Sequence, residues 1–155
     1  MRIWDTDPGY LNRQSLLGEH RELHGIFSII LNKKKGYENH PETIRWKGHL
    51  SGLAKRHELL AAEMCLRGFK HHSPLTDPGL PLSWPSVFIN SPDEQFSILR
   101  EKYKHREGGR IPLPLSPQEF WAHHKYSVMA RDPNYYRAVG PMLANPQRNI
   151  SLRDI

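Results

Sequence analysis

The most regular hydrophobic pattern in the chain predicts an amphipathic helix over residues 12–31. At about 100° per residue, its main apolar side chains share one stripe: Leu16, Leu23, Phe27 and Ile30, flanked by Leu17 and Ile26. Glu22 falls at the border of this stripe, about 100° from its centre. Glu19 falls close to the stripe itself, where a carboxylate needs a partner such as an arginine or faces an active site.

A second helical region is predicted over residues 41–67, with Gly48 and Gly52 as weak points and an end at Gly68. Between the two regions, the lysines of residues 33–35 place positive charge at the end of the first helix, and Gly36 is expected to cap it. The proline-rich stretch over residues 71–92 shows little periodicity and is predicted to be an ordered loop or a lid.

The second half of the chain contains two capping signals with proline at the first helical position. Residues 91–94 (Ser-Pro-Asp-Glu) open a helix to about residue 105, and residues 116–119 (Ser-Pro-Gln-Glu) open one to about residue 130. A short helix is predicted from Asp132 to Gly140, and residues 145–155 form a loose tail. With no strand pattern, we expect an all-α fold: one domain over residues 1–155, with four to five helices and long proline-rich loops.

The composition favours a soluble, basic protein. The 155 residues carry a net charge of +6 and a pI of about 9.6, and 37% are hydrophobic. Twenty-two lysines and arginines favour a polyanionic partner, for which nucleic acid is the first candidate, although charge alone leaves a basic protein without such a partner equally open. The longest apolar run is too short for a membrane span, and no signal peptide is visible. The single cysteine, Cys65, is expected to be a buried thiol, which fits a reducing cytoplasm.

Two stretches carry a resemblance to a known family. Arg21-Glu22-Leu23, and the longer run from Lys55 to Phe69 (KRHELLAAEMCLRGF), are similar to the pyrimidine-dimer DNA glycosylases of the phage endonuclease V type. The resemblance covers roughly the first half of the chain and fades beyond about Pro74. It implies a DNA repair glycosylase with abasic-site lyase activity, a monomer acting on double-stranded DNA with damaged pyrimidines such as cyclobutane dimers, in the cytoplasm with the nucleoid.

The family's mechanism implies two catalytic groups here: the α-amine of Met1 as nucleophile and Glu22 as the assisting carboxylate. Methionine aminopeptidases need a small second residue, and because the second residue here is Arg2, we expect Met1 to be retained. An α-amine suits the reaction because it titrates at about 7.7–8.0 and a lysine at about 10.4. Roughly a fifth of α-amines are therefore neutral and nucleophilic at neutral pH, against under about a thousandth of lysines. The alternatives are an inert N-terminus and a surface glutamate.

Basic and aromatic residues give the candidate DNA contacts. Arg2 and Arg21 are expected to hold phosphates beside an extruded nucleotide. Further candidates are His20, His24, Lys33, Lys35, Tyr135, Tyr136 and Arg137. For each, a role without DNA contact stays open: solvent-exposed arginines, ordinary surface histidines, a solvated helix end, and tyrosines that belong to the core.

The sequence departs from the family in ways that leave the lesion open. Where the family has a histidine this chain has Ser15, and where it has an arginine it has Gly25. A glycosylase for a different modified base is therefore one alternative, and a non-catalytic basic helical module that binds nucleic acid is another.

No cofactor and no metal are expected from the sequence. The adjacent pairs His71-His72 and His123-His124 point apart on a helix, and the segment from His57 lacks the second histidine of a zincin motif. There is no cysteine pair for zinc.

Overall fold

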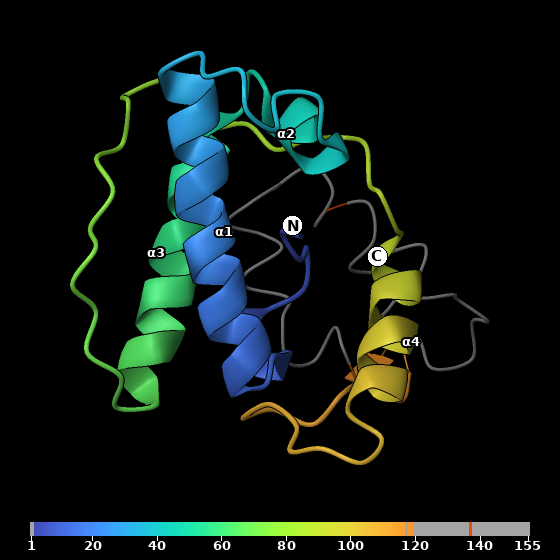
Figure 1. The fold of residues 1–155 in the computed structure, drawn as a ribbon. Coiled ribbons are helices and arrows are strands. Elements are labelled where there is room, and N and C mark those ends of the chain that lie inside the picture. Colours follow the sequence, from blue (N-terminus) through green and yellow to red (C-terminus); the bar gives the residue numbers. More distant parts are fainter. Residues whose placement is uncertain (1, 117, 120–136, 138–155) are drawn as a thin grey trace. The chain divides into compact units, whose positions relative to one another are not determined.

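The computed structural model describes residues 2–116, 118–119 and 137 (Figure 1). These residues form a 3₁₀ turn and four α-helices and contain no strand, so the all-α prediction is confirmed for the described part of the chain. The chain divides into two compact units, Met1–Ile89 and Asn90–Ile155. That the whole chain acts as one domain stays a prediction.

Helix α1 (Arg13–Leu31) begins where the sequence predicts. The side chain of Asn12 accepts a hydrogen bond from the Ser15 amide at 2.9 Å and caps the helix. Leu16, Leu23 and Phe27 are buried as expected. The cap at the other end differs from the prediction, because Lys33 and not Gly36 adopts the left-handed conformation, with φ of 51°. The Lys34 amide then bonds the Ile29 carbonyl at 3.0 Å, which closes the helix.

The second predicted helical region is two helices in the structure, α2 (Pro41–Trp46) and α3 (Leu50–Leu66). The break falls at Gly48, whose φ of 80° suits a glycine, and Gly68, whose φ is 79°, follows the C-cap residue Arg67 of α3. Gly52 does not break the chain. It is buried within α3, where a Cβ atom would lie 2.1 Å from the Ser83 carbonyl oxygen. Glycine therefore lets the segment after α3 pack directly on the helix.

Helix α3 corrects one expectation, because Cys65 is exposed and not buried. Leu60 and Met64 lie on the buried face of α3. Cys65 follows Met64 by one residue and is turned about 100° away from that face. Within the first unit, α1 packs against both α2 and α3, and α3 also contacts the 3₁₀ turn η1 (Pro8–Tyr10). In Figure 1, α1 and α3 lie side by side.

The second unit contains helix α4 (Pro92–Lys102), which buries Phe96 and Leu99 and ends slightly before the predicted limit. Its predicted cap is present, since the Ser91 hydroxyl accepts from the Glu94 amide at 3.3 Å. The next capping signal also forms, with the Glu119 amide donating to Ser116 at 3.1 Å. The predicted helices to residue 130 and from Asp132, and the tail, lie outside the described residues.

None of the helices in the described part of the chain has the length and apolar character needed to cross a membrane.

Candidate functional site

The N-terminal arm, residues 2–6, is held to the helices by carboxylates. Three glutamates accept hydrogen bonds from three successive arm amides: Arg2 N to Glu22 Oε2 at 2.8 Å, Ile3 N to Glu42 Oε2 at 2.5 Å, and Trp4 N to Glu19 Oε1 at 3.3 Å. Two of these glutamates lie on α1 and one on α2. Because hydrogen bonds to ionised groups are among the stronger ones, this arrangement fixes the register of the arm against both helices.

The glutamate nearest the apolar stripe has the arginine partner that its position requires. Arg56 of α3 binds Glu19 in a two-pronged contact, with Nε–Oε2 at 2.6 Å and Nη2–Oε1 at 2.8 Å, and its Nη1 donates to the Thr6 carbonyl at 2.6 Å. Both side chains are buried. Although burial disfavours the charged form, the charge and hydrogen bonds of Glu19 raise the pKa of Arg56. The pair thus ties α1, α3 and the arm together.

A second buried arginine serves the same arm from α2. Arg45 Nη1 binds Glu42 Oε1 at 2.9 Å, and its Nη2 forms an ion pair with Asp5. Its Nη1 also reaches the Ile3 carbonyl at 3.4 Å, and its Nε donates to the Val87 carbonyl at 2.7 Å. Arginines therefore bind arm carbonyls and carboxylates bind arm amides, so the arm is held on both sides of its backbone.

Glu22 is the carboxylate closest to the start of the chain. It is half-buried, as its border position on the stripe predicts. Its Oε2 accepts from the Arg2 amide, and within the described residues its Oε1 has no hydrogen-bond partner. One oxygen is therefore used for holding the arm, and the other is left for a further ligand. Met1, the predicted nucleophile, lies outside the described residues.

The predicted phosphate ligands have different surroundings. Arg2 is half-buried, with its guanidinium carbon 4.8 Å from the centroid of the Trp4 ring. Arg21 is exposed and forms no ion pair with any residue that the structure describes. Lys33 and Lys35 are exposed at the end of α1. All four remain candidate DNA ligands.

The remaining candidates lie in the second unit. Arg137 is exposed, whereas Tyr135 and Tyr136 lie outside the described residues. Their predicted contacts with DNA stay predictions.

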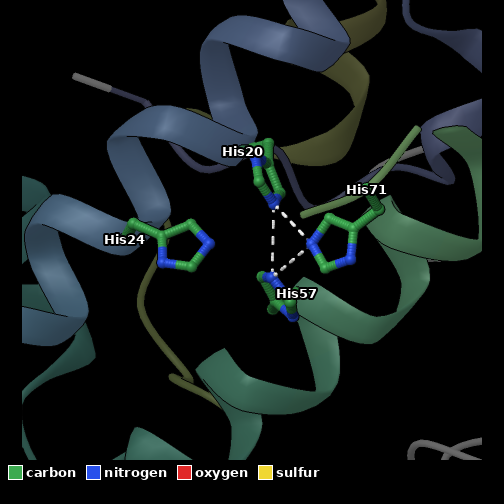
Figure 2. Close-up of side chains that lie close together, drawn as sticks. All are labelled: His20, His24, His57 and His71. Atoms are coloured by element: carbon green, nitrogen blue, oxygen red, sulfur yellow. Dashed lines mark hydrogen bonds between the residues drawn. The ribbon is translucent and has the colours of Figure 1, made fainter. Parts of the chain in front are cut away.

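His20 and His24 occupy a feature that the sequence did not predict. Together with His57 of α3 and His71 of the segment after it, they form a histidine cluster whose possible ligand atoms all lie within 4.8 Å of one another. Figure 2 shows the rings of His20, His57 and His71 turned toward a common point, with His24 beside them. The three Nε2 atoms lie 3.2 Å (His20–His57), 3.0 Å (His20–His71) and 3.2 Å (His57–His71) apart.

The environment of the two α1 histidines favours their neutral forms. Burial, followed by the charges of His24, His57 and His71, lowers the pKa of His20 to about 4. The pKa of His24 is lowered as well, again first by burial. His57 is completely buried. Neutral imidazoles leave one lone pair on each ring, and imidazole nitrogens with free lone pairs are the kind of atom that binds transition metals.

Sequence reasoning missed the parts of the site that lie far apart along the chain. The signal for the cluster was the spacing of His20 and His24, which places them one turn apart on one side of a helix. The signal for the second arginine was the three-residue spacing of Glu42 and Arg45. Neither spacing alone shows that His57 and His71, or the arm, come to the same place.

Comparison with known proteins finds one family model that matches the first part of the chain. Residues 1–77 match the family model described as pyrimidine dimer DNA glycosylase, which covers just under half of the chain. This segment contains the arm, all three glutamates, both buried arginines and the histidine cluster. No curated protein and no solved structure matches the chain.

Proposed function

We propose that this chain, whose residues 1–77 belong to the pyrimidine dimer DNA glycosylase family, removes damaged pyrimidines from double-stranded DNA and then cleaves the abasic site. The family name indicates a DNA glycosylase. The lyase step, the imine and the choice of lesion are the parts that we add. The observation that supports them best is the hydrogen bond from the Arg2 amide to Glu22, because it brings the start of the chain to the predicted catalytic carboxylate.

Covalent geometry extends this observation by one residue. The α-amine is joined to the Arg2 nitrogen through two carbon atoms, so standard bond lengths keep the two nitrogens within about 4 Å in any conformation. The Arg2 nitrogen is 2.8 Å from Glu22 Oε2, and on this basis we propose that the amine acts beside this carboxylate. A sugar carbon attacked by the amine would therefore be within reach of Glu22, either directly or through one water molecule.

The reaction that we propose begins with the neutral amine attacking C1′ of the nucleotide. The nitrogen–carbon bond forms as the bond from C1′ to the base breaks, and the base leaves with a proton. The sugar ring then opens as the bond from C1′ to O4′ breaks, the second proton of the nitrogen passes to O4′, and an imine is left at C1′. The imine acidifies C2′, so removal of a C2′ proton expels the 3′ phosphate by β-elimination.

Glu22 is the residue that we assign to these proton movements. A carboxylate beside C1′ stabilises the positive charge that develops as the base departs, and it accepts or returns protons during elimination. Its half-buried position limits competition from water, while its Oε1 has no partner among the described residues. The nucleotide must leave the helical stack for this chemistry, because C1′ is shielded in stacked DNA. Exposed Arg21, one residue away on α1, is placed to bind a flanking phosphate.

The assay that tests this proposal uses a duplex oligonucleotide with one cyclobutane pyrimidine dimer and an undamaged duplex of the same sequence. We expect base excision and strand cleavage on the damaged duplex only. A non-catalytic nucleic-acid-binding module would bind both and cleave neither. Excision from another modified base, with none at the dimer, would support the glycosylase activity and overturn the choice of lesion.

A further inference from the structure

The histidine cluster has a hydrogen-bonding problem that the protein cannot solve by itself. Three Nε2 atoms, from His20, His57 and His71, lie 3.0–3.2 Å from one another. Each such nitrogen carries either a hydrogen or a lone pair and is therefore a donor or an acceptor. Among three atoms with two possible roles, at least two must have the same role. At least one of the three close contacts then sets hydrogen against hydrogen or lone pair against lone pair.

The neighbouring polar groups do not remove this conflict. The Ser73 carbonyl oxygen lies 3.1 Å from His57 Nε2. If His57 donates its hydrogen to Ser73, no hydrogen remains on it for His20 or His71, and the conflict increases. His24 adds a further unsatisfied atom, since its buried Nε2 has no hydrogen-bond partner. Unpaired polar atoms in buried places are costly, and each one in a native protein needs an explanation such as a bound ion.

A metal ion removes the conflict, because all three nitrogens can then present lone pairs to one cation. Around tetrahedral zinc, with Zn–N at about 2.05 Å, ligand nitrogens are about 3.3 Å apart. The observed separations are close to this value. Nitrogens with these separations lie on a circle of radius about 1.8 Å, so a point about 1 Å from their plane is about 2.05 Å from each of them. The geometry points to a zinc-type divalent metal site formed by His20, His57 and His71, with His24 as the fourth ligand.

Contacts outside the three nitrogens fit this assignment. Glu58 Oε1 lies 3.2 Å from His57 Nδ1, the ring atom that faces away from the cluster. A hydrogen on Nδ1 donated to this carboxylate leaves the lone pair on Nε2, which is the tautomer that binds metal. Imidazole ligands suit zinc, copper and nickel better than magnesium or calcium. Zn²⁺ is therefore the ion that we assign and the probe that we would use.

The site joins three parts of the first unit. His20 and His24 come from α1, His57 from α3, and His71 from the segment that follows α3 (Figure 2). Glu22 is two residues from both α1 histidines and is therefore turned about 160° away from each of them around the helix. The metal would thus hold α1 to α3 and to the following segment without entering the region of Glu22. We infer a structural role, which differs from the metal-free expectation given by the sequence.

The test compares two adjacent histidines in the full chain. His71→Ala removes a proposed ligand, whereas His72→Ala changes an exposed neighbour outside the cluster. Metal-free protein would be titrated with Zn²⁺ against a chromophoric chelator, and with Co²⁺ to record the visible spectrum. We expect one metal per chain, a tetrahedral Co²⁺ spectrum, and a higher midpoint of thermal unfolding with Zn²⁺ for the wild type and for His72→Ala. His71→Ala should weaken binding by more than the ~10–100-fold typical of residues that only orient a ligand.

A second variant guards against a folding defect. His71→Cys keeps a zinc ligand and should recover most of the affinity that His71→Ala loses, with a Co²⁺ spectrum that gains a sulfur charge-transfer band. Three results would overturn the site. The wild type could bind no stoichiometric metal, His71→Ala could bind as tightly as His72→Ala, or the Co²⁺ spectrum could be that of an octahedral, water-rich complex.

Discussion

Helix α1 carries two polar clusters on different sides, and the groups in them are satisfied to very different degrees. On one side, Glu19 and Glu22 bind arm amides, and Glu19 has both oxygens bound by Arg56. On the other side, His20 and His24 face two further histidines, with like atoms in contact and a buried nitrogen without a partner. Both clusters are at least partly removed from water, so solvation does not explain the difference.

The arm carboxylates find their partners within the chain, whereas the histidine cluster needs a ligand from outside it. The arm cluster consists of arm residues 2–6 and the side chains that bind them, Glu19, Glu22, Glu42, Arg45 and Arg56. It pairs each buried arginine with carboxylates and carbonyls, and this pairing offsets the cost of burying the charge. Within the described residues, Glu19 and Glu42 have both carboxylate oxygens bound, whereas Glu22 has one oxygen bound and its Oε1 left over, where we place the substrate. The histidine cluster brings three Nε2 atoms into mutual contact, where their donor and acceptor roles cannot all match, and a cation would remove this conflict. Changes in the arm cluster should therefore act independently of metal, and changes in the histidine cluster should depend on it.

The largest effect is expected from removing the charge of Glu22. Glu22→Gln keeps an oxygen that can accept from the Arg2 amide, so the arm should stay in place. Excision should fall by ~10²–10⁴ because the principal acid-base group is lost. The measurement is single-turnover base excision, with Glu101→Gln, at an exposed position of α4, as the control. Near-normal excision by Glu22→Gln would remove this residue from the mechanism.

Breaking the buried ion pair should mainly affect stability. Glu19→Gln leaves Arg56 buried beside a neutral group, and the free energy of unfolding should fall by about 3–5 kcal/mol. Urea denaturation measures this, with the same Glu101→Gln control expected within about 0.5 kcal/mol of wild type. The loss should be equal with and without Zn²⁺. A loss that appears only in the presence of Zn²⁺ would show that the two clusters are not independent.

A smaller effect is expected where the segment after α3 meets the helix. Gly52→Ala places a Cβ 2.1 Å from the Ser83 carbonyl oxygen and should destabilise the fold by about 1–3 kcal/mol. Gly18→Ala is the matched control, because nothing lies within 4 Å of its added Cβ. Replacing that glycine within α1 should stabilise by roughly 0.5–1 kcal/mol. Equal effects of the two substitutions on thermal unfolding would contradict the close packing at Gly52.

The smallest effect concerns binding to DNA. Arg21→Ala should make the log–log dependence of DNA affinity on salt shallower by about 0.9, the value for one phosphate contact. Equilibrium binding at several salt concentrations measures this slope. The control is Lys102→Ala, which removes one positive charge from an exposed residue at the end of α4. An unchanged slope for Arg21→Ala would mean that this arginine does not contact a phosphate.

Local sequence signals predicted the helices well. The start of α1 near residue 12 and the stop at Gly68 depend on neighbouring residues, so they can be predicted from a short window of sequence. The position of Glu19 near the apolar stripe left two possibilities, a partner such as an arginine or a place facing an active site, and the structure shows the partner to be Arg56. The exposed Cys65 was missed, because an apolar composition around a residue does not say which side of a helix it occupies.

The three-dimensional clusters could not be predicted in the same way. His20 and His71 are 51 residues apart, and Arg45 reaches the arm across about 40 residues. Such contacts depend on how the helices pack, and only the long-range geometry brings these groups together. The expectation that neighbouring histidines on a helix point apart does not apply to His71 and His72, which lie outside any helix, and it did not exclude a site that takes one histidine from the pair.

The most direct test of the account is to trap the proposed imine. Protein is mixed with a duplex that contains one abasic site, the imine is reduced with borohydride, and the adduct is located by mass spectrometry of peptides. We expect a covalent adduct on the Met1 amine. An otherwise identical protein with extra residues before Met1 should form none, while keeping DNA affinity within a few fold. An adduct on Lys33 or Lys35, or equal trapping by the extended protein, would contradict the central claim that the arm delivers the catalytic amine to Glu22.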